Sequence, residues 1–521
     1  MNLLRAITTV GGFTMLSRVF GFIRDMLIAA FMGAGPVADA FFVAFKLPNL
    51  FRRLFAEGAF AAAFVPIFAG RLESDGAERA KLVAEQALSV LVVSAVLVTA
   101  VFEVAMPWVM RAVVPGFLDD PETFDLTVTL TRITFPYLVF ISVVSLLSGV
   151  LNSLGKFAAA AATPVLLNIC LIGALLTVTP YMPSPGHALA WGVSAAGVVQ
   201  LVWLYVAAAR AGVRLRFIAP VLSPDVRTLF NRALPVALGG GVYQVSLVID
   251  TIIASLLPAG SISFLFYADR VNQLPLGVVG VAVGTALLPM LSRQLRAGDA
   301  RAAANSQNRS IEFALLLTLP AAAALFIIAE PIIRVLFERG EFTPATTSAT
   351  AAALAVYAIG LPAYVLVKAL APGFFAREDT KTPVVISCIA LAVNLVLNLL
   401  LMGPFLHVGI AMATSASAWL NCLLLAVVLR RRGQLPLDTR LTTRLPRTAI
   451  AVAAMCLTLV VLQPHLADGL AAPALADRVF NLVVLVAAGL ATFGVAAVVS
   501  GAARPSDLRA FLGPARSTGN S

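Results

Sequence analysis

The chain has 521 residues, of which 60% are hydrophobic and only 12% are charged, and its mean hydropathy is +0.94. A soluble globular protein does not carry that much apolar surface, so the composition indicates an integral membrane protein. The formal net charge of +11 does not indicate nucleic-acid binding, because the excess arginines lie between or inside apolar runs rather than in a basic domain.

Apolar runs long enough to cross a bilayer follow one another along the whole chain. At roughly 20 residues per membrane-spanning helix, they predict about fourteen spans. The approximate ranges are 7–32, 37–69, 83–107, 128–153, 157–179, 188–209, 228–257, 262–292, 311–336, 347–371, 382–402, 408–429, 447–464 and 478–500. The connections are short, so the predicted fold is an all-α polytopic membrane protein.

Lysine and arginine gather in alternate loops of this predicted topology. Arg71, Arg79 and Lys81 lie in one such loop, whereas the opposite loops are short or acidic, as in "FLDDPETFD" at 117–125. Because positively charged loops stay in the cytoplasm, both termini are predicted to be cytoplasmic.

The sequence also repeats itself weakly, since residues 38–72 align without a gap on residues 261–295. Identical residues meet at several positions: Phe41 with Phe264, Asn49 with Asn272, Pro66 with Pro289, and Leu72 with Leu295. Chance similarity is the alternative to a true duplication. A duplication of six spans would relate the two halves by a pseudo-two-fold axis along the membrane normal. We therefore predict an N-terminal lobe at 1–216, a C-terminal lobe at 217–432, and a helix pair with a cytoplasmic tail at 433–521.

Charged residues lie inside several predicted spans. The stretch "SRVFGFIRDMLIAAFMG" at 17–33 contains Arg18, Arg24 and Asp25. A charge at the bilayer centre costs about 2.5–3.5 kcal/mol, so these side chains are expected to face protein or a hydrated cavity. Arg18 and Asp25 share a helix face. Arg24 and Asp25 are adjacent, so we expect them not to pair with each other.

The second predicted span carries a polar stripe on one helix face, because its polar residues recur at spacings of four and seven. These residues are Asp39, Lys46, Asn49, Arg53 and Glu57. Arg52 lies beside the stripe, and the matching region of the second half adds Asp269 and Arg270. Cations exceed anions, and arginine suits bidentate phosphate binding. The pattern predicts a hydrated cavity for an anionic cargo.

Two simpler interpretations of these charges stay open. In one, Arg52 and Arg53 snorkel to the membrane interface. In the other, Arg53 and Glu57 form only an intrahelical ion pair.

A second polar group lies in later spans and consists of Asp250, Asn394, Asn398 and Thr414. Oxygen ligands without His or Cys suit a hard cation such as Na⁺, and hydrogen bonding between helices is the alternative. The four cysteines and three histidines are scattered. We find neither a nucleotide-binding lysine motif nor a nucleophile–base pair, so no enzyme activity is predicted.

Three stretches resemble one known family. They are "SRVFGFIRD" at 17–25, "ADAFFVAFKLPNLFRRLFAEGAFAAAFVPIF" at 38–68 and "YADRVNQLPLGVVG" at 267–280. They are similar to the MurJ (MviN) family of lipid II flippases, in the multidrug/oligosaccharidyl-lipid/polysaccharide exporter superfamily. The resemblance implies two six-helix lobes and two extra C-terminal helices that form a groove for a lipid tail.

The resemblance also implies a transporter rather than an enzyme. Its cargo would be lipid II, the undecaprenyl-diphosphate-linked peptidoglycan precursor, moved from the inner to the outer leaflet of the bacterial cytoplasmic (inner) membrane by alternating access. The expected partners are lipid II, membrane lipids and, as candidates, peptidoglycan-synthesis proteins. The protein is expected to be a monomer and not to bind nucleic acid.

The motifs assign roles to individual residues. Arg18, Arg24, Arg52 and Arg270 resemble the family's essential cavity arginines. The other matching motif positions are Asp25, Asp39, Asn49, Arg53, Glu57 and Asp269. Some members bind Na⁺ between spans seven, eleven and twelve, a pattern that Asp250, Asn394 and Thr414 fit. Asn398 stands where such members carry a carboxylate, so this chain has one negative charge fewer there.

Four other functions compete with this interpretation. A drug/cation antiporter of the same superfamily would favour carboxylates over arginines in its cavity, and a related exporter would carry another polyprenyl-diphosphate oligosaccharide. A membrane enzyme acting on lipid diphosphates needs clustered catalytic or metal-binding carboxylates, which the sequence does not show. In a scaffold for wall-synthesis proteins the charges would be only structural.

Overall fold

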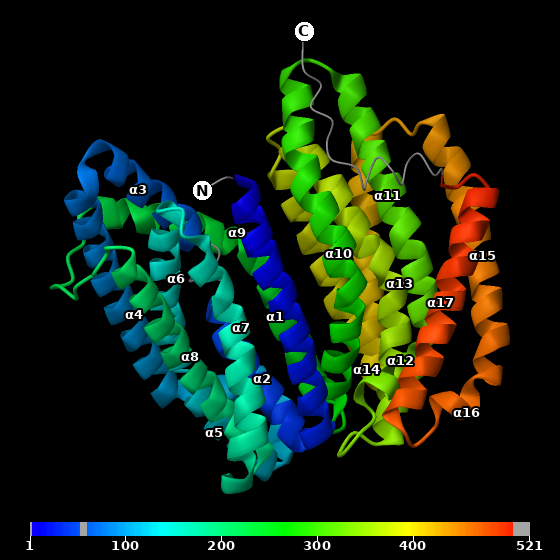
Figure 1. Cartoon of the computed structure of the whole chain (residues 1–521), viewed down its shortest axis with the longest axis horizontal. Coiled ribbons are helices and arrows are strands. Elements are labelled where there is room, and N and C mark those ends of the chain that lie inside the picture. Colours follow the sequence, from blue (N-terminus) through cyan, green and yellow to red (C-terminus); the bar gives the residue numbers. More distant parts are fainter. Residues whose placement is uncertain (1–2, 53–59, 504–521) are drawn as a thin grey trace. The chain divides into compact units, whose positions relative to one another are not determined.

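The computed structural model describes residues 3–52 and 60–503 (Figure 1). The α-helices are α1 (Leu3–Met32), α2 (Pro36–Phe51), α3 (Ala61–Ser74), α4 (Gly76–Val113), α5 (Pro121–Thr134), α6 (Tyr137–Ser153), α7 (Phe157–Gly173), α8 (Pro185–Arg210), α9 (Pro224–Ser255), α10 (Ser261–Arg296), α11 (Ala300–Ile327), α12 (Ala329–Phe337), α13 (Pro344–Phe375), α14 (Lys381–Arg431), α15 (Thr439–His465), α16 (Ala467–Leu470) and α17 (Leu475–Val499). Short 3₁₀-helices lie at Pro115–Asp119 and Thr179–Tyr181, and a short π-helix lies at Ala174–Val178.

The described ranges contain no β-strand, which confirms the predicted all-α class. Lipid offers no hydrogen-bond partners to backbone amides and carbonyls, and a helix satisfies them internally. In this part of the chain, nine helical stretches are long and apolar enough to cross a membrane. One of them, α14, contains two predicted spans, because its helix breaks at Leu406, where φ is 51° and ψ is −134°. The predicted number of fourteen is consistent with these helices.

Some predicted spans are not single helices. The span predicted at 128–153 divides into α5 and α6 around Pro136, since proline cannot donate the amide hydrogen that a continuing helix requires. The span predicted at 311–336 divides into α11 and α12 at Ile328. The span predicted at 37–69 covers α2 and α3, and the residues between them lie outside the described ranges.

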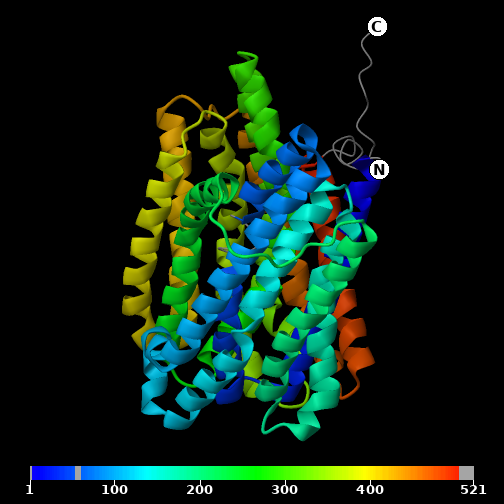
Figure 2. The same ribbon diagram turned by 90° about the vertical axis from the view of Figure 1, so that its left-hand side faces the viewer.

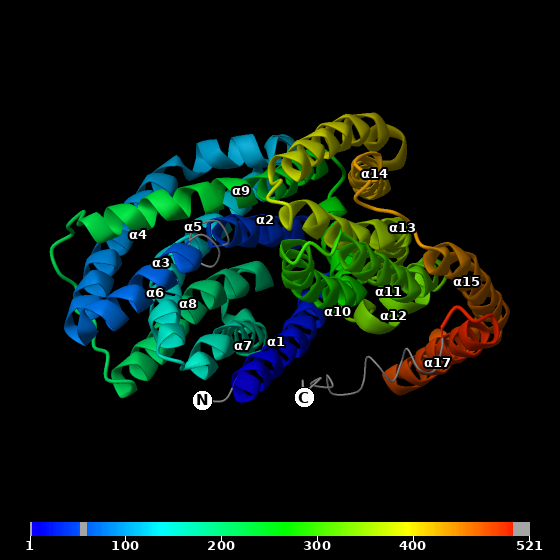
Figure 3. The ribbon, with the colours of Figure 1, turned by 90° about the horizontal axis from the view of Figure 1, so that it is seen from above.

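The chain forms two compact units, Met1–Ser263 with Arg339–Thr343 and Phe264–Glu338 with Pro344–Ser521. Helix α9 belongs to the first unit, where it packs beside α3 and α4 (Figure 3). The sequence instead placed a lobe boundary after residue 216. The compact units reflect packing, whereas the predicted lobes reflect the sequence repeat. The lobe boundaries therefore stay a prediction.

In the first unit, α1 packs against α7, α2 against α5, and α6 against α8. An aromatic cluster fixes part of this packing. The ring of Phe51 lies edge-on to Phe102 with centroids 5.1 Å apart, and Phe102 stacks on Phe135 at 5.1 Å.

A short loop also belongs to the first unit, although both of its flanking helices belong to the second. The amide of Glu341 donates to the carbonyl of Ala30 at the end of α1, at 2.9 Å. Gly340 has φ +56°, and a Cβ at this residue would lie 2.2 Å from the Ala30 oxygen. Glycine is therefore required for this close backbone approach.

In the second unit, α11, α13 and α14 surround a large apolar core. The C-terminal helices α15 and α17 lie side by side (Figures 1 and 3). Charged groups tie α15 to α11, because Glu312 accepts from Arg444 at 2.6 Å and from Arg440 at 3.2 Å. Arg309 joins the same network through Glu312 and Asp438.

Candidate functional site

The best-defined polar site lies between α1 and α7. Arg24 of α1 is 7% exposed and Asp25 is 3% exposed. The Asp25 carboxylate accepts from Arg24 Nε at 3.0 Å and from Nη2 at 2.6 Å. Arg24 Nη1 donates to Oδ1 of Asn168 at 2.8 Å, and Asn168 Nδ2 donates to the carbonyl of Ser17 at 3.0 Å. The guanidinium is thereby held in a single orientation.

The expectation that Arg24 and Asp25 do not pair is wrong. Adjacent residues leave a helix in different directions, but the long arginine side chain curls back to reach the neighbouring carboxylate. Burial favours this geometry, because an unpaired charge in a low-dielectric interior is far more costly than a bent side chain.

Gly21 allows α1 to approach α7 closely at this site. A Cβ on Gly21 of α1 would lie 3.4 Å from the Asn168 amide nitrogen. The Phe45 ring of α2 also faces the Arg24 guanidinium, with the ring centroid at 5.9 Å. Three helices therefore define the surroundings of one arginine.

Arg18 lies in a different environment from Arg24. Its side chain is exposed, and no ion pair joins it to another residue of the described ranges. Arg18 and Asp25 were predicted to share a face, but Asp25 is buried against Arg24. The first predicted span thus carries one neutralised guanidinium and one exposed guanidinium.

Asp39 in α2 is 2% exposed and receives hydrogen bonds at the start of α10. Its carboxylate accepts from the amide of Gly260 at 2.6 Å and from the amide and hydroxyl of Ser263 at 2.8 and 2.5 Å. A carboxylate is favourable at a helix N-terminus, where amides lack partners and the helix dipole is positive. The contact is within the first unit.

The remainder of the polar stripe on α2 makes separate contacts. Lys46 Nζ donates to the Thr251 hydroxyl of α9 at 2.7 Å. Arg52 Nε donates to Asn49 Oδ1 at 3.1 Å, and the Asn49 amide donates to the carbonyl of Phe45 at 2.8 Å. Arg53 and Glu57 lie outside the described residues.

Two predicted site residues of α10 belong to the second unit. The Arg270 guanidinium lies over the Phe266 ring, 4.6 Å from its centroid. Asp269 accepts a hydrogen bond from Gln273, one turn further along the helix.

The four predicted Na⁺ ligands are divided between the units, with Asp250 in the first and the other three in the second. Asn398 Nδ2 donates to Asn394 Oδ1 at 3.1 Å, and the Thr414 hydroxyl donates to the carbonyl of Ile410 at 2.8 Å. No cluster of three or more His, Cys, Asp or Glu suited to a metal occurs among the described residues.

Sequence reasoning did not assign site roles to Asn168, Thr251 or Ser263. Each makes its contact with a residue more than one hundred positions away. A lone polar residue within an apolar span was the available signal, since such residues usually bond to a neighbouring helix.

Charged residues within the apolar segments of a polytopic membrane protein are typical of transporters. The family model described as "Lipid II flippase MurJ" matches residues 28–475. A probable lipid II flippase MurJ of Rhizobium meliloti is 48% identical over 515 residues, covering 98% of this chain and 96% of that protein. The lipid II flippase MurJ of Burkholderia cenocepacia is 41% identical, covering 83% and 85%.

The chain therefore belongs to the MurJ family of lipid II flippases, which are transporters rather than enzymes. Solved structures agree on the fold. A lipid II flippase MurJ in an inward closed conformation has a TM-score of 0.78 at 23% identity, covering 94% of this chain and 98% of that one. An inward-facing multidrug transporter of the MATE family has a TM-score of 0.67 at 15% identity, covering 82% and 98%.

Asp25→Ala should destabilise the protein by about 3–5 kcal/mol, because it leaves the buried Arg24 guanidinium without its anion. The measurement is chemical or thermal unfolding of the purified protein in detergent. Asp75→Ala is the control, since it removes an anion from a solvent-exposed pair with Arg71 and should change stability little. Equal effects of both substitutions would show that the buried pair has no special role.

Proposed function

We propose that this protein moves lipid II from the inner to the outer leaflet of the bacterial inner membrane by alternating access. The observation that supports it most is the buried Arg24 guanidinium, which Asp25 and Asn168 hold within the first predicted span. The identity of the cargo is inferred from the relatives, which are named as lipid II flippases. A diphosphate is an anion that arginine binds well, because a planar guanidinium can meet two oxygens at once.

The arginines differ in what they offer such a cargo. Arg24 uses three of its N–H donors on Asp25 and Asn168, so its remaining donors point in a direction that the protein sets. Arg18 is exposed and can adjust to the cargo. Arg52 and Arg270 complete the proposed set, with Asp25, Asp39, Asn49, Arg53, Glu57 and Asp269 as neighbours that tune or position them.

The finer features of the assignment are also proposals. We propose that both termini are cytoplasmic, as the loop charges predict, and that the protein acts as a monomer in contact with membrane lipids. Peptidoglycan-synthesis proteins are proposed partners, because lipid II is their substrate class.

We further propose Na⁺ as a coupling ion, bound by oxygens of Asp250, Asn394, Asn398 and Thr414. Oxygen-only ligands support a hard cation. The Asn398 amide in place of a carboxylate predicts weak binding, because it removes one negative charge.

The test of the proposed function is a leaflet-specific assay of lipid II in vesicles that contain the purified protein. Wild type should expose lipid II in the opposite leaflet, and Arg18→Ala should abolish this activity while inserting normally. Wild-type vesicles that show no more exchange than protein-free vesicles would overturn the proposal.

Arg18→Lys and Arg270→Lys should each weaken lipid II binding by about 1.5–3 kcal/mol, the scale of a hydrogen bond to a charged group. Lysine keeps the charge but cannot form two parallel hydrogen bonds with one anion. Native mass spectrometry with lipid II gives the affinity, and undecaprenol, which lacks the diphosphate, is the matched control ligand. Unchanged lipid II affinity in both variants would refute the geometric role of the guanidinium.

Asp250→Ala should remove any thermal stabilisation that Na⁺ gives over K⁺, because it deletes the sole charged ligand of the proposed site. Melting curves of both proteins in the two salts measure this difference. A wild type that melts at the same temperature in Na⁺ and K⁺ argues against the ion site and leaves the lipid II proposal intact.

A further inference from the structure

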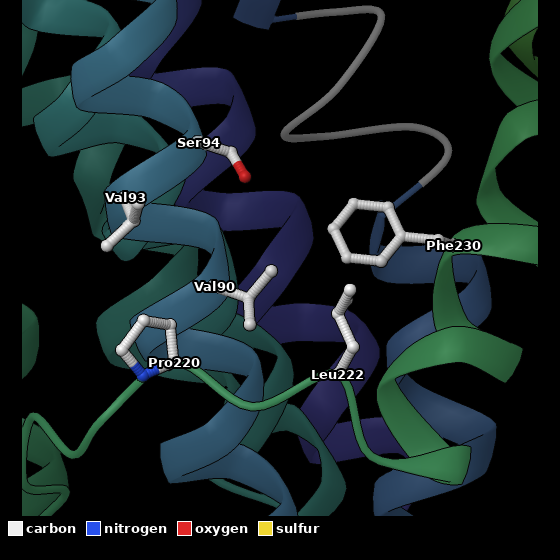
Figure 4. Close-up of a pocket in the computed structure, with 6 residues that line it drawn as sticks. All are labelled: Val90, Val93, Ser94, Pro220, Leu222 and Phe230. Carbon is white, nitrogen blue, oxygen red and sulfur yellow. The ribbon is translucent and has the colours of Figure 1, made fainter.

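A groove with a volume of about 470 Å³ lies between α4 and the start of α9 (Figure 4). Its walls come from three segments of the first unit: Val90, Val93 and Ser94 of α4, Pro220 and Leu222 of the connection from α8, and Phe230 of α9. Five of these six side chains are hydrocarbon, and the volume lies in the range of small-ligand sites.

The connection from α8 to α9, residues 211–222, forms an extended strap across this face of the unit (Figure 2). Two buried side chains of α4 hold the strap in place. Glu85 Oε1 accepts from the amide of Arg216 at 3.0 Å, and the Ser89 hydroxyl accepts from the amide of Ile218 at 3.0 Å.

These two hydrogen bonds fix the direction of the strap along α4. Arg216 lies at the level of Glu85, whereas Pro220 and Leu222 lie at the level of Val90 to Ser94. Since a helix rises 1.5 Å per residue, Glu85 and Val93 are about 12 Å apart along α4. The basic part of the strap therefore lies at one end of the groove and the apolar part lines it.

The charged residues of the strap itself are all basic. Arg214 and Arg216 are exposed, and the strap contains no acidic residue. Glu85 is already engaged by the strap amide and by Lys81, whose ammonium lies 4.0 Å away. This end of the groove belongs to a predicted cytoplasmic loop, where anionic lipid headgroups attract basic residues.

We propose that the groove binds one anionic phospholipid, with an acyl chain against Val93, Leu222 and Phe230 and the phosphate near Arg214 and Arg216. An apolar trough joined to a basic mouth matches the two halves of such a lipid. A transmembrane helix is a poorer occupant, because helix contacts favour small residues that permit close backbone approach, and Leu222 and Phe230 are large. The inference does not rest on the proposed lipid II transport.

The test uses the full-length protein in detergent and native mass spectrometry with phosphatidylglycerol and phosphatidylcholine of identical chains. Wild type should bind phosphatidylglycerol more tightly, on the order of tenfold, because its headgroup has a net negative charge that Arg214 and Arg216 attract, whereas the choline of phosphatidylcholine offsets its phosphate. Arg214→Gln with Arg216→Gln should abolish this preference and keep the weaker binding of phosphatidylcholine. Arg301→Gln with Arg431→Gln makes the same change of charge elsewhere and should keep the preference.

A second variant tests the acyl-chain site. Val93→Trp fills the groove and should weaken the binding of both phospholipids several-fold. Val104→Trp is the matched control, because Val104 is an exposed residue of α4 outside the groove lining. Lipid II affinity should be unchanged in both tryptophan variants.

Several outcomes would overturn the proposal. These are equal wild-type affinity for the two phospholipids, equal effects of the two tryptophan variants, and loss of lipid II binding instead of phospholipid binding in Val93→Trp. A dimer in the wild-type spectrum that disappears in Val93→Trp would also overturn it, by assigning the groove to a second copy of the chain.

Discussion

Lipid solvates neither charges nor backbone polar groups, and the rest of the structure depends on this constraint. The pairing of Arg24 with Asp25 is one consequence of it. Each such group in a span must find its partner within the protein. Asp39 does so at the amides of Gly260 and Ser263 at the start of α10, and Lys46 does so at the Thr251 hydroxyl. These contacts explain why polar residues in apolar helices join segments that are distant in the sequence.

The same constraint separates two kinds of arginine in α1. A fully paired guanidinium is stable but offers few donors to a cargo, whereas an unpaired one offers many donors but is costly to bury. Arg24 lies near the first limit and exposed Arg18 near the second. A transporter must bind its cargo and also release it, so a mixture of fixed and adjustable cations suits the task better than a set of either kind alone.

Much of the fold could be predicted because membrane spans depend on local composition. Length and hydropathy located the helices, and the motifs in α1, α2 and α10 identified the family. Helix breaks such as the one at Pro136 were missed, because an apolar run continues through them. The pairing of Arg24 with Asp25 was excluded by helix geometry alone, which neglects side-chain length and the cost of burial. The partners Asn168 and Ser263 were missed because long-range contacts leave no spacing signal.

The basic residues outside the spans require a further distinction that loop charge alone does not provide. The positive-inside rule treats all cytoplasmic arginines alike. The structure separates Arg444, which is buried against Glu312 at 2.6 Å, from Arg214 and Arg216, which are exposed on the strap. The charge of Arg444 is neutralised by Glu312, and this ion pair joins α15 to α11. Only arginines that are not buried in ion pairs can contact lipid headgroups. The position of exposed basic residues beside an apolar groove therefore says more about lipid binding than the number of basic residues does.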